Sequence, residues 1–169
     1  MNARLSRLLD YALYGALGVT LVTFVSRKMS GPTEGKTAAP IDLPLLGEEK
    51  RFKLAEHANR PVLLEVFASW CGVCERTAPS VGAAFAKHSK SGVTFLGVSV
   101  DSNPADAARA KQSWPIPYDV ALDDGSLSRA YDIKVLPTFV LIGADGRVKH
   151  VSTGAASEST LESWLSDAR

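Results

Sequence analysis

Cysteine is scarce in this sequence, and neither sign of charge dominates it. The 169 residues include two cysteines, 19 basic and 18 acidic side chains. Two cysteines are too few for a small domain stapled by disulfides, or for a zinc site with four thiolates. Residues 41–169 carry 14 basic and 16 acidic side chains, so they lack the basic surface that indicates nucleic-acid binding. Repeats and low-complexity tracts are also missing, which excludes solenoids and collagen-like fibres.

A long apolar segment near the N-terminus predicts a membrane anchor. Residues 8–26 are nearly all apolar, and Asp10 is their one charged member. As a helix, this segment would be roughly 28 Å long, enough to cross the hydrocarbon core of a bilayer. We therefore expect residues 1–28 to form an uncleaved single-span anchor. A cleaved signal peptide, which needs a shorter core and a small-residue cleavage site, and a buried core helix are the alternatives.

The charges that flank this segment indicate its orientation. The α-amino group and two arginines precede it, whereas one arginine and one lysine follow it. This small excess favours a cytoplasmic N-terminus, with the rest of the chain outside the cytoplasm. Residues 29–40 are polar and rich in proline and glycine, so we expect a flexible linker there and a folded domain over residues 41–169.

Hydrophobic spacing in the domain predicts strands that alternate with helices. Continuous apolar runs at 61–67 and 93–100 are typical of strands buried on both faces. Helical spacing extends over 73–88, where Pro79 predicts a kink. The pattern predicts a three-layer α/β/α fold with a mixed central sheet. The remaining expected elements are an edge strand at 51–54, helices at 104–113, 126–131 and 158–168, and strands at 118–122, 138–142 and 147–152, the last two joined by a hairpin turn at 144–146.

Both cysteines lie in one motif, Trp70-Cys71-Gly72-Val73-Cys74, between an expected strand and an expected helix. A Cys-x-x-Cys pair at this place is a redox signature, because its thiols can close a disulfide without moving the backbone. Cys71 would lie at the helix N-terminus, where unpaired N–H groups and the helix dipole favour the thiolate. Cys74, one turn further on, would be more buried and would act as the resolving thiol.

Glu65 lies inside a buried strand, six residues before Cys71. Its neighbours along the chain are apolar, so ordinary packing does not explain a carboxylate there. Burial should raise its pKa and make it a candidate proton acceptor for Cys74, directly or through water. The alternative is that Glu65 faces solvent and pairs with a nearby Lys or Arg.

Trp70, Leu136 and Pro137 are candidates for the substrate-binding surface. Trp70 would form an apolar wall beside the cysteines, unless it packs against the sheet. Pro137 directly precedes an expected strand. A cis bond there would open the Leu136 backbone to an extended substrate passing beside Cys71. Because only about 5–6% of X–Pro bonds are cis, the sequence leaves the isomer open.

Taken together, these features resemble the thioredoxin superfamily. The resemblance rests on residues 66–74, on Glu65 at the family's buried-acid position, on Pro79 at its helix-kink position, on Pro137 at its cis-proline position, and on residues 136–148. It extends over the whole expected domain. The match is specific as to fold and chemistry.

An extra helix and strand between residues 100 and 130 are similar to the insertion of the TlpA/ResA/CcmG-like branch. The resemblance implies a protein disulfide oxidoreductase, more often a reductant, whose redox centre is the Cys71–Cys74 disulfide with no other cofactor and no metal. It implies protein disulfide or dithiol substrates, and recharging by a membrane electron donor of the DsbD/CcdA type. It also implies a single-pass protein of the bacterial inner membrane, with its thioredoxin-like domain in the periplasm.

Four positions depart from the pattern of that branch. Glu75 replaces the Lys or Arg of many relatives, and an acid there should slightly disfavour the thiolates. Thr138 follows Pro137, where cytochrome-maturation members commonly have Glu, which weakens a cytochrome-specific interpretation. The pair Gly72-Val73 is neither the Gly-Pro of many reductants nor the Pro-His of strong oxidants. The reduction potential is therefore left open.

A metal-binding module is the rival interpretation. Cys71 and Cys74 could hold copper(I) or zinc, because soft thiolates suit copper(I). The three histidines, at positions 57, 88 and 150, are scattered and have no partner at metal-ligand spacing. A redox-inert adaptor is the third possibility, although both cysteines of the motif are present.

Overall fold

A computed structural model of the chain describes residues 34–114 and 116–168. The expected anchor at residues 1–28 and the first part of the expected linker lie outside the described residues. Within the described ranges, no helix combines the length and the apolar character needed to span a membrane.

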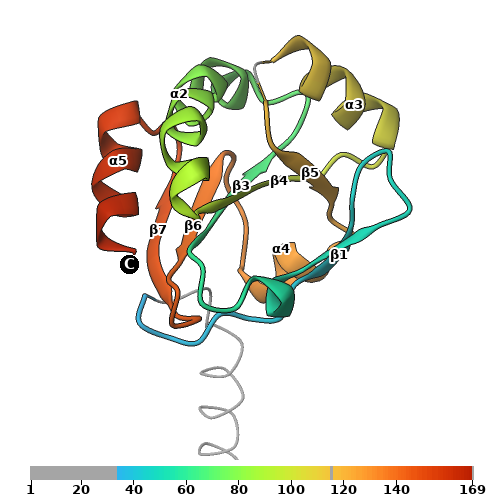
Figure 1. The fold of residues 1–169 in the computed structure, drawn as a ribbon. Coiled ribbons are helices and arrows are strands. Elements are labelled where there is room, and N and C mark those ends of the chain that lie inside the picture. The colour runs from blue at the N-terminus through green and yellow to red at the C-terminus, as the bar shows by residue number, and fades with distance from the viewer. Residues whose placement is uncertain (1–33, 115, 169) are drawn as a thin grey trace, which may run out of the picture. The chain divides into compact units, whose positions relative to one another are not determined.

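A five-stranded mixed sheet forms the centre of the domain, in the order β5-β4-β3-β6-β7 (Figure 1). The central strand β3 runs parallel to β4 and antiparallel to β6. All six residues of β3 are buried, as the continuous apolar run predicts. The predicted α/β fold with a mixed central sheet is confirmed. The strands of this sheet are β3 (Val62–Phe67), β4 (Thr94–Ser99), β5 (Asp119–Leu122), β6 (Thr138–Ile142) and β7 (Val148–Thr153).

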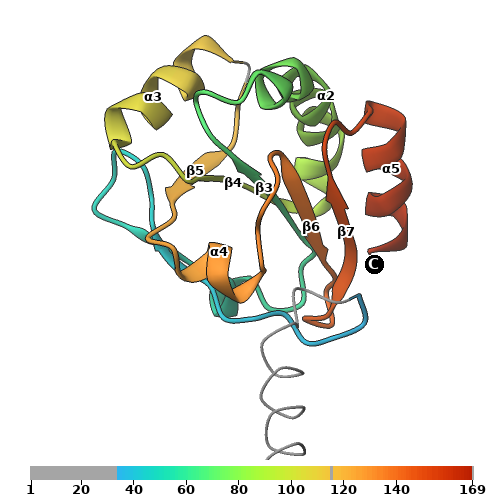
Figure 2. The same cartoon turned by 180° about the vertical axis from the view of Figure 1, so that it is seen from behind.

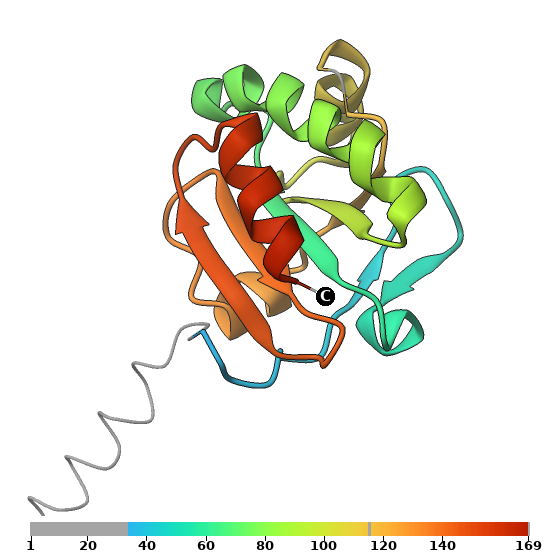
Figure 3. The same cartoon turned by 60° about the vertical axis from the view of Figure 1, so that its left-hand side comes forward.

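Helices cover both faces of the sheet. Helices α2 and α5 lie side by side over one face (Figure 3), and α4 lies on the opposite face (Figure 2). The start of α3 matches its local signal, because the Asn103 side chain accepts a hydrogen bond from the Ala105 N–H at 3.0 Å. The helices are α2 (Gly72–His88), α3 (Pro104–Ser113), α4 (Ser126–Ala130) and α5 (Glu158–Asp167), with short 3-10 helices at Leu54–His57 and Ser89–Ser91.

Alternation along β3 divides the core into two parts. Leu63 and Phe67 belong to the cluster that includes α2, α5 and the cysteines. Val62, Leu64 and Val66 belong to the cluster on the other face, beneath α4. Because successive side chains of a strand point to opposite faces, Glu65 faces the same side as Leu63 and Phe67.

The expected edge strand at 51–54 does not join the central sheet. Strand β2 (Arg51–Lys53) pairs instead with β1 (Asp42–Pro44) in a separate two-stranded antiparallel sheet. The end of this unit approaches β5, where the Leu46 N–H donates to the Val120 carbonyl at 2.8 Å. A short hairpin therefore covers the free edge of β5, an edge that would otherwise expose unpaired backbone groups.

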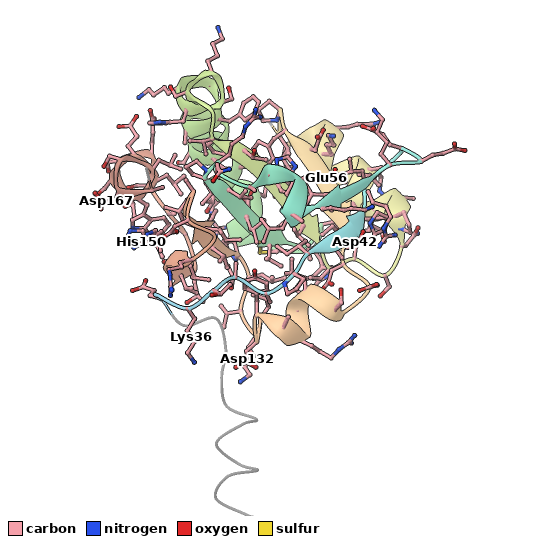
Figure 4. The ribbon with its side chains drawn as sticks, turned by 60° about the horizontal axis from the view of Figure 1, so that its bottom comes forward. Lys36, Asp42, Glu56, Asp132, His150 and Asp167 are labelled. Carbon is pink, nitrogen blue, oxygen red and sulfur yellow. A yellow bond between two sulfur atoms is a disulfide. The ribbon has the colours of Figure 1, made fainter. Side chains whose placement is uncertain are left out.

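The chain from Glu34 to Pro40 is part of the domain, which differs from the expected boundary at residue 41. The Gly35 N–H donates to the Val148 carbonyl at 2.7 Å, and the Ala38 N–H donates to the Gly146 carbonyl at 2.9 Å. In Figure 4, Lys36 lies on this segment, close to the strand that carries His150. The segment lacks a strand pattern, but its backbone groups find partners at the open edge beside β7.

Candidate active site

The two cysteines form a disulfide at the N-terminal end of α2. Its S–S distance is 2.07 Å and the two Cα atoms lie 5.3 Å apart. Cys71 is the N-cap residue of the helix and is 7% exposed, whereas Cys74, in the first turn, is completely buried. Of the two cysteines, Cys71 is therefore the one that retains some exposure to solvent.

A backbone N–H of the first helical turn points at the Cys71 sulfur. The Cys74 N–H donates to the Cys71 Sγ at 3.1 Å. This N–H is one of the donors that a helix leaves unpaired at its N-terminus, where the helix dipole is also positive. After reduction, the same geometry favours the ionised thiolate of Cys71 over the thiol.

A buried carboxylate fixes the loop that leads into the cysteines. Asp101, just after β4, accepts hydrogen bonds from the Ser69 N–H at 2.9 Å and from the Ser69 and Ser99 hydroxyls, both at 2.8 Å. Sequence reasoning missed Asp101. An acidic residue just after a buried parallel strand lies at the carboxyl end of the sheet, where functional residues of α/β folds gather, and this position could have identified it. Through Ser69, Asp101 sets the backbone two residues before Cys71.

Glu65 lies in the core with 3% of its surface exposed. The Tyr118 hydroxyl donates a hydrogen bond to its Oε2 at 2.5 Å. Burial raises the pKa of Glu65 to about 7, and the hydrogen bond from Tyr118 opposes that rise in pKa without cancelling it. The alternative in which Glu65 faces solvent and pairs with a Lys or Arg is therefore wrong.

Sequence reasoning did not identify Tyr118, but Gly97 gave a signal. Gly97 stands opposite Glu65 in the pairing of β3 with β4. A Cβ atom at Gly97 would lie 3.1 Å from the Phe67 ring, 3.2 Å from Val120 and 3.5 Å from the Tyr118 ring. A glycine inside an otherwise bulky strand indicates such a close approach of other side chains, and here it makes room for the ring that reaches Glu65.

The loop before β6 lies at the same end of the sheet as the disulfide. Val66 pairs with Thr138, so this loop is next to the chain that leads from β3 to Cys71. The Leu136–Pro137 peptide bond is cis, which resolves the isomer that the sequence left open. Leu136 is half-buried and Pro137 is buried.

Apolar side chains are exposed around this end of the sheet. Trp70 is 73% exposed and Val135 is 50% exposed, and they are the large hydrophobic residues most open to solvent among the described residues. Trp70 therefore does not pack against the sheet. A polar groove of about 610 Å³ runs beside it, lined in part by Glu75, Asp106 and Arg109.

The described residues offer no further metal ligands grouped with the cysteines. Within residues 34–114 and 116–168, no group of three or more His, Cys, Asp or Glu side chains is arranged to hold a metal ion. His57 stacks on Phe52 with ring centroids 4.5 Å apart, and His150 stacks on Trp164 at 5.8 Å. These two histidines thus have structural contacts of their own.

Comparison with known proteins agrees with this geometry. The Redoxin family model matches residues 33–165. The thiol-disulfide oxidoreductase ResA of Geobacillus kaustophilus is 28% identical over 155 residues, covering 90% of this chain and 88% of that protein. ResA of Bacillus subtilis is 30% identical over 152 residues, covering 89% and 84%. A crystal structure assigned to a thiol:disulfide interchange protein DsbE from Chlorobium tepidum has a TM-score of 0.73 at 29% identity, covering 80% of this chain and 97% of that one.

These similarities span the sheet, the helices and the cysteine motif together. The family model covers most of the chain, and the ResA proteins match it over nearly their whole length. The chain therefore belongs to the Redoxin family and is a thiol–disulfide oxidoreductase of the ResA type, within the thioredoxin superfamily.

Proposed function

We propose that this protein is tethered to the bacterial inner membrane and reduces disulfides of other proteins outside the cytoplasm. The observation that carries the proposal is the pairing of two sulfurs of unequal accessibility at a helix N-terminus. Cys71 retains 7% exposure and receives an N–H bond, whereas Cys74 is completely buried. A nucleophile that partners can reach and a protected resolving thiol require this asymmetry.

The reaction starts from the reduced protein. The Cys71 thiolate attacks one sulfur of a substrate disulfide, the substrate S–S bond breaks, and one substrate sulfur leaves as a thiolate. The Cys74 thiolate then attacks Cys71 Sγ, which breaks the mixed disulfide and releases the second substrate thiolate. Two electrons pass to the substrate, and the protein is left with the Cys71–Cys74 disulfide that the structure contains.

Glu65 takes the proton of Cys74 in this scheme, directly or through water. With a pKa of about 7, the carboxyl group can both accept and release a proton near neutral pH. A membrane electron donor of the DsbD/CcdA type then reduces the disulfide again and completes the cycle.

Trp70, Leu136 and Pro137 form the substrate-binding surface in this proposal. The exposed indole of Trp70 and the loop before β6 flank the end of the sheet where Cys71 lies. An apolar rim of this kind suits an extended polypeptide segment with its own apolar side chains next to a cystine.

The tether is the apolar segment at residues 8–26, whose sequence is long enough to cross a bilayer as a helix. Labelling the cysteines of intact cells with a membrane-impermeant thiol reagent, after reduction, tests this part of the proposal. Labelling in intact cells is expected, and labelling only after lysis would contradict the location.

A trapping experiment tests the chemistry. In native membranes, a Cys74→Ala variant should accumulate mixed disulfides on Cys71 that mass spectrometry identifies. The Cys71→Ala, Cys74→Ala double variant is the matched control and should capture nothing. If the single variant also captures nothing, and the wild-type chain exchanges no electrons with insulin or another model disulfide, the proposal is wrong. Copper that remains bound through purification and is lost in Cys→Ser variants would favour the metal-binding alternative instead.

A further inference from the structure

The carboxylate of Glu65 depends on one neighbour for its polar contact. Within residues 34–114 and 116–168, the Tyr118 hydroxyl is the side-chain group that hydrogen-bonds to it, at 2.5 Å. The buried polar and charged side chains of the described residues are Glu65, Thr77, Ser99, Asp101 and Thr138, with no Lys, Arg or His among them. No buried cation is therefore available to stabilise a negative charge on Glu65.

Tyr118 is held in place by its ring. The ring lies 5.7 Å from that of Phe85 on α2 and 5.9 Å from that of Phe95 on β4. Gly97 leaves the space into which this ring extends. Packing against α2 and β4 therefore holds the Tyr118 hydroxyl next to Glu65. Because the ring is already fixed, little side-chain freedom is lost when the hydrogen bond forms.

We propose that Tyr118 is a positioning residue of the reaction, which orients the Glu65 carboxylate and stabilises its ionised form so that it can accept the proton of Cys74. The proposal rests on the role given to Glu65 in the proposed function. The other buried titratable groups on this side of the sheet are Cys71, Cys74 and Asp101, and the Asp101 carboxylate is bonded to Ser69 and Ser99. The side chains that β4 and β6 contribute next to Glu65, those of Phe95 and Phe139, do not ionise.

The physical reason is the cost of a charge in an apolar site. An ionised carboxylate without a hydrogen-bond donor is so unfavourable in such a site that it takes up a proton and becomes neutral. Burial already raises the pKa of Glu65 to about 7. Loss of the Tyr118 hydroxyl would raise that pKa further, and Glu65 would then hold its own proton at neutral pH. Burial and the charge of Glu65 raise the pKa of Tyr118 well above 10, so the phenol remains a donor.

The test is a direct titration of the Glu65 carboxyl group in the full-length, oxidised chain in detergent micelles. Infrared or carbon-13 NMR spectra follow its ionisation, and a Glu65→Gln variant identifies the signal. In Tyr118→Phe, which keeps the ring, the midpoint should rise by about one pH unit, equal to a tenfold change in proton affinity. Tyr131→Phe is the matched control, because the buried Tyr131 hydroxyl donates to the Ala39 carbonyl at 3.0 Å in the other core cluster.

A second measurement does not depend on the Tyr118→Phe variant being folded. Replacement of tyrosine by 3-fluorotyrosine makes the hydroxyl a more acidic and stronger donor, so the Glu65 midpoint should move down. An unchanged midpoint in both Tyr118→Phe and the fluorinated protein would overturn the inference, whatever the chain does to disulfides.

Kinetics separate this inference from the proposed function. In single-turnover reduction of a model disulfide, the pH profile of the resolving step should shift upward in Tyr118→Phe by the same amount as the carboxyl midpoint. The substitution should have no further effect in a Glu65→Gln background. A shifted carboxyl midpoint together with an unchanged pH profile in Glu65→Gln would support the contact and overturn the base role of Glu65.

Discussion

Replacement of Glu65 by Gln should remove a pH dependence from the stability of the fold. Burial raises the pKa of Glu65 from 4.5 to about 7 in the folded chain, so the folded state holds this proton over a range in which the unfolded state has lost it. Unfolding then releases a proton, and the free energy of unfolding falls as the pH rises from about 4.5 to about 7. The loss is complete about one pH unit above the folded-state pKa, and the difference stays constant beyond that point.

The size of the effect follows from the difference between the two pKa values. A separation of about 2.5 pKa units, at about 1.4 kcal/mol per unit, makes the free energy of unfolding about 3.5 kcal/mol larger at low pH than at high pH. Most of it falls between about pH 5 and pH 8. Gln cannot ionise, so Glu65→Gln should lack this component, although it shares every other titration of the chain.

Urea denaturation of the oxidised full-length chain, followed by tryptophan fluorescence at several pH values, measures the difference. The free energy of unfolding of wild type, relative to that of Glu65→Gln, should decline by roughly 2.5 kcal/mol between pH 5 and pH 8. Glu49→Gln, which removes an exposed carboxylate, serves as the control and should follow the wild type. Parallel curves for wild type and Glu65→Gln would refute the reasoning, because they would mean that Glu65 ionises equally easily in both states.

Two further substitutions test the packing around the site. Gly97→Ala places a Cβ 3.1 Å from Phe67 and 3.2 Å from Val120. It should lower the free energy of unfolding, measured by urea denaturation, by about 1–3 kcal/mol. An unchanged value would show that these two side chains move aside without cost. Asp101→Ala removes the acceptor of the Ser69 N–H and hydroxyl, so hydrogen exchange at the Ser69 amide should accelerate, whereas equal protection would show that the loop is held by other contacts.

Local signals in the sequence predicted most of the architecture. Asn103-Pro104 marked the start of α3, since an N-cap side chain and a proline in the first turn need no distant partner. The apolar run that became β3 predicted a strand buried on both faces, and Glu65 within it predicted a buried acid. Each of these inferences depends on neighbours within a few positions along the chain.

What the sequence could not reveal depends on contacts between distant segments. Tyr118 and Glu65 are 53 positions apart, and their meeting follows from the register of three strands, which spacing alone does not specify. The segment at 34–40 resembled a linker because it lacks periodicity, yet its backbone pairs with the edge at β7. The isomer of the Leu136–Pro137 bond is likewise settled in the folded chain.

The docking of Gly35 and Ala38 beside the β6–β7 turn fixes where the described chain enters the domain. Val62 pairs with Ile142 next to that turn, whereas Val66 pairs with Thr138 at the opposite pole, from which the chain continues to Cys71. The length of β3, roughly 20 Å, therefore separates the point of entry from the sulfurs. The described chain therefore enters the domain near one end of β3, and its reactive cysteines follow the other end.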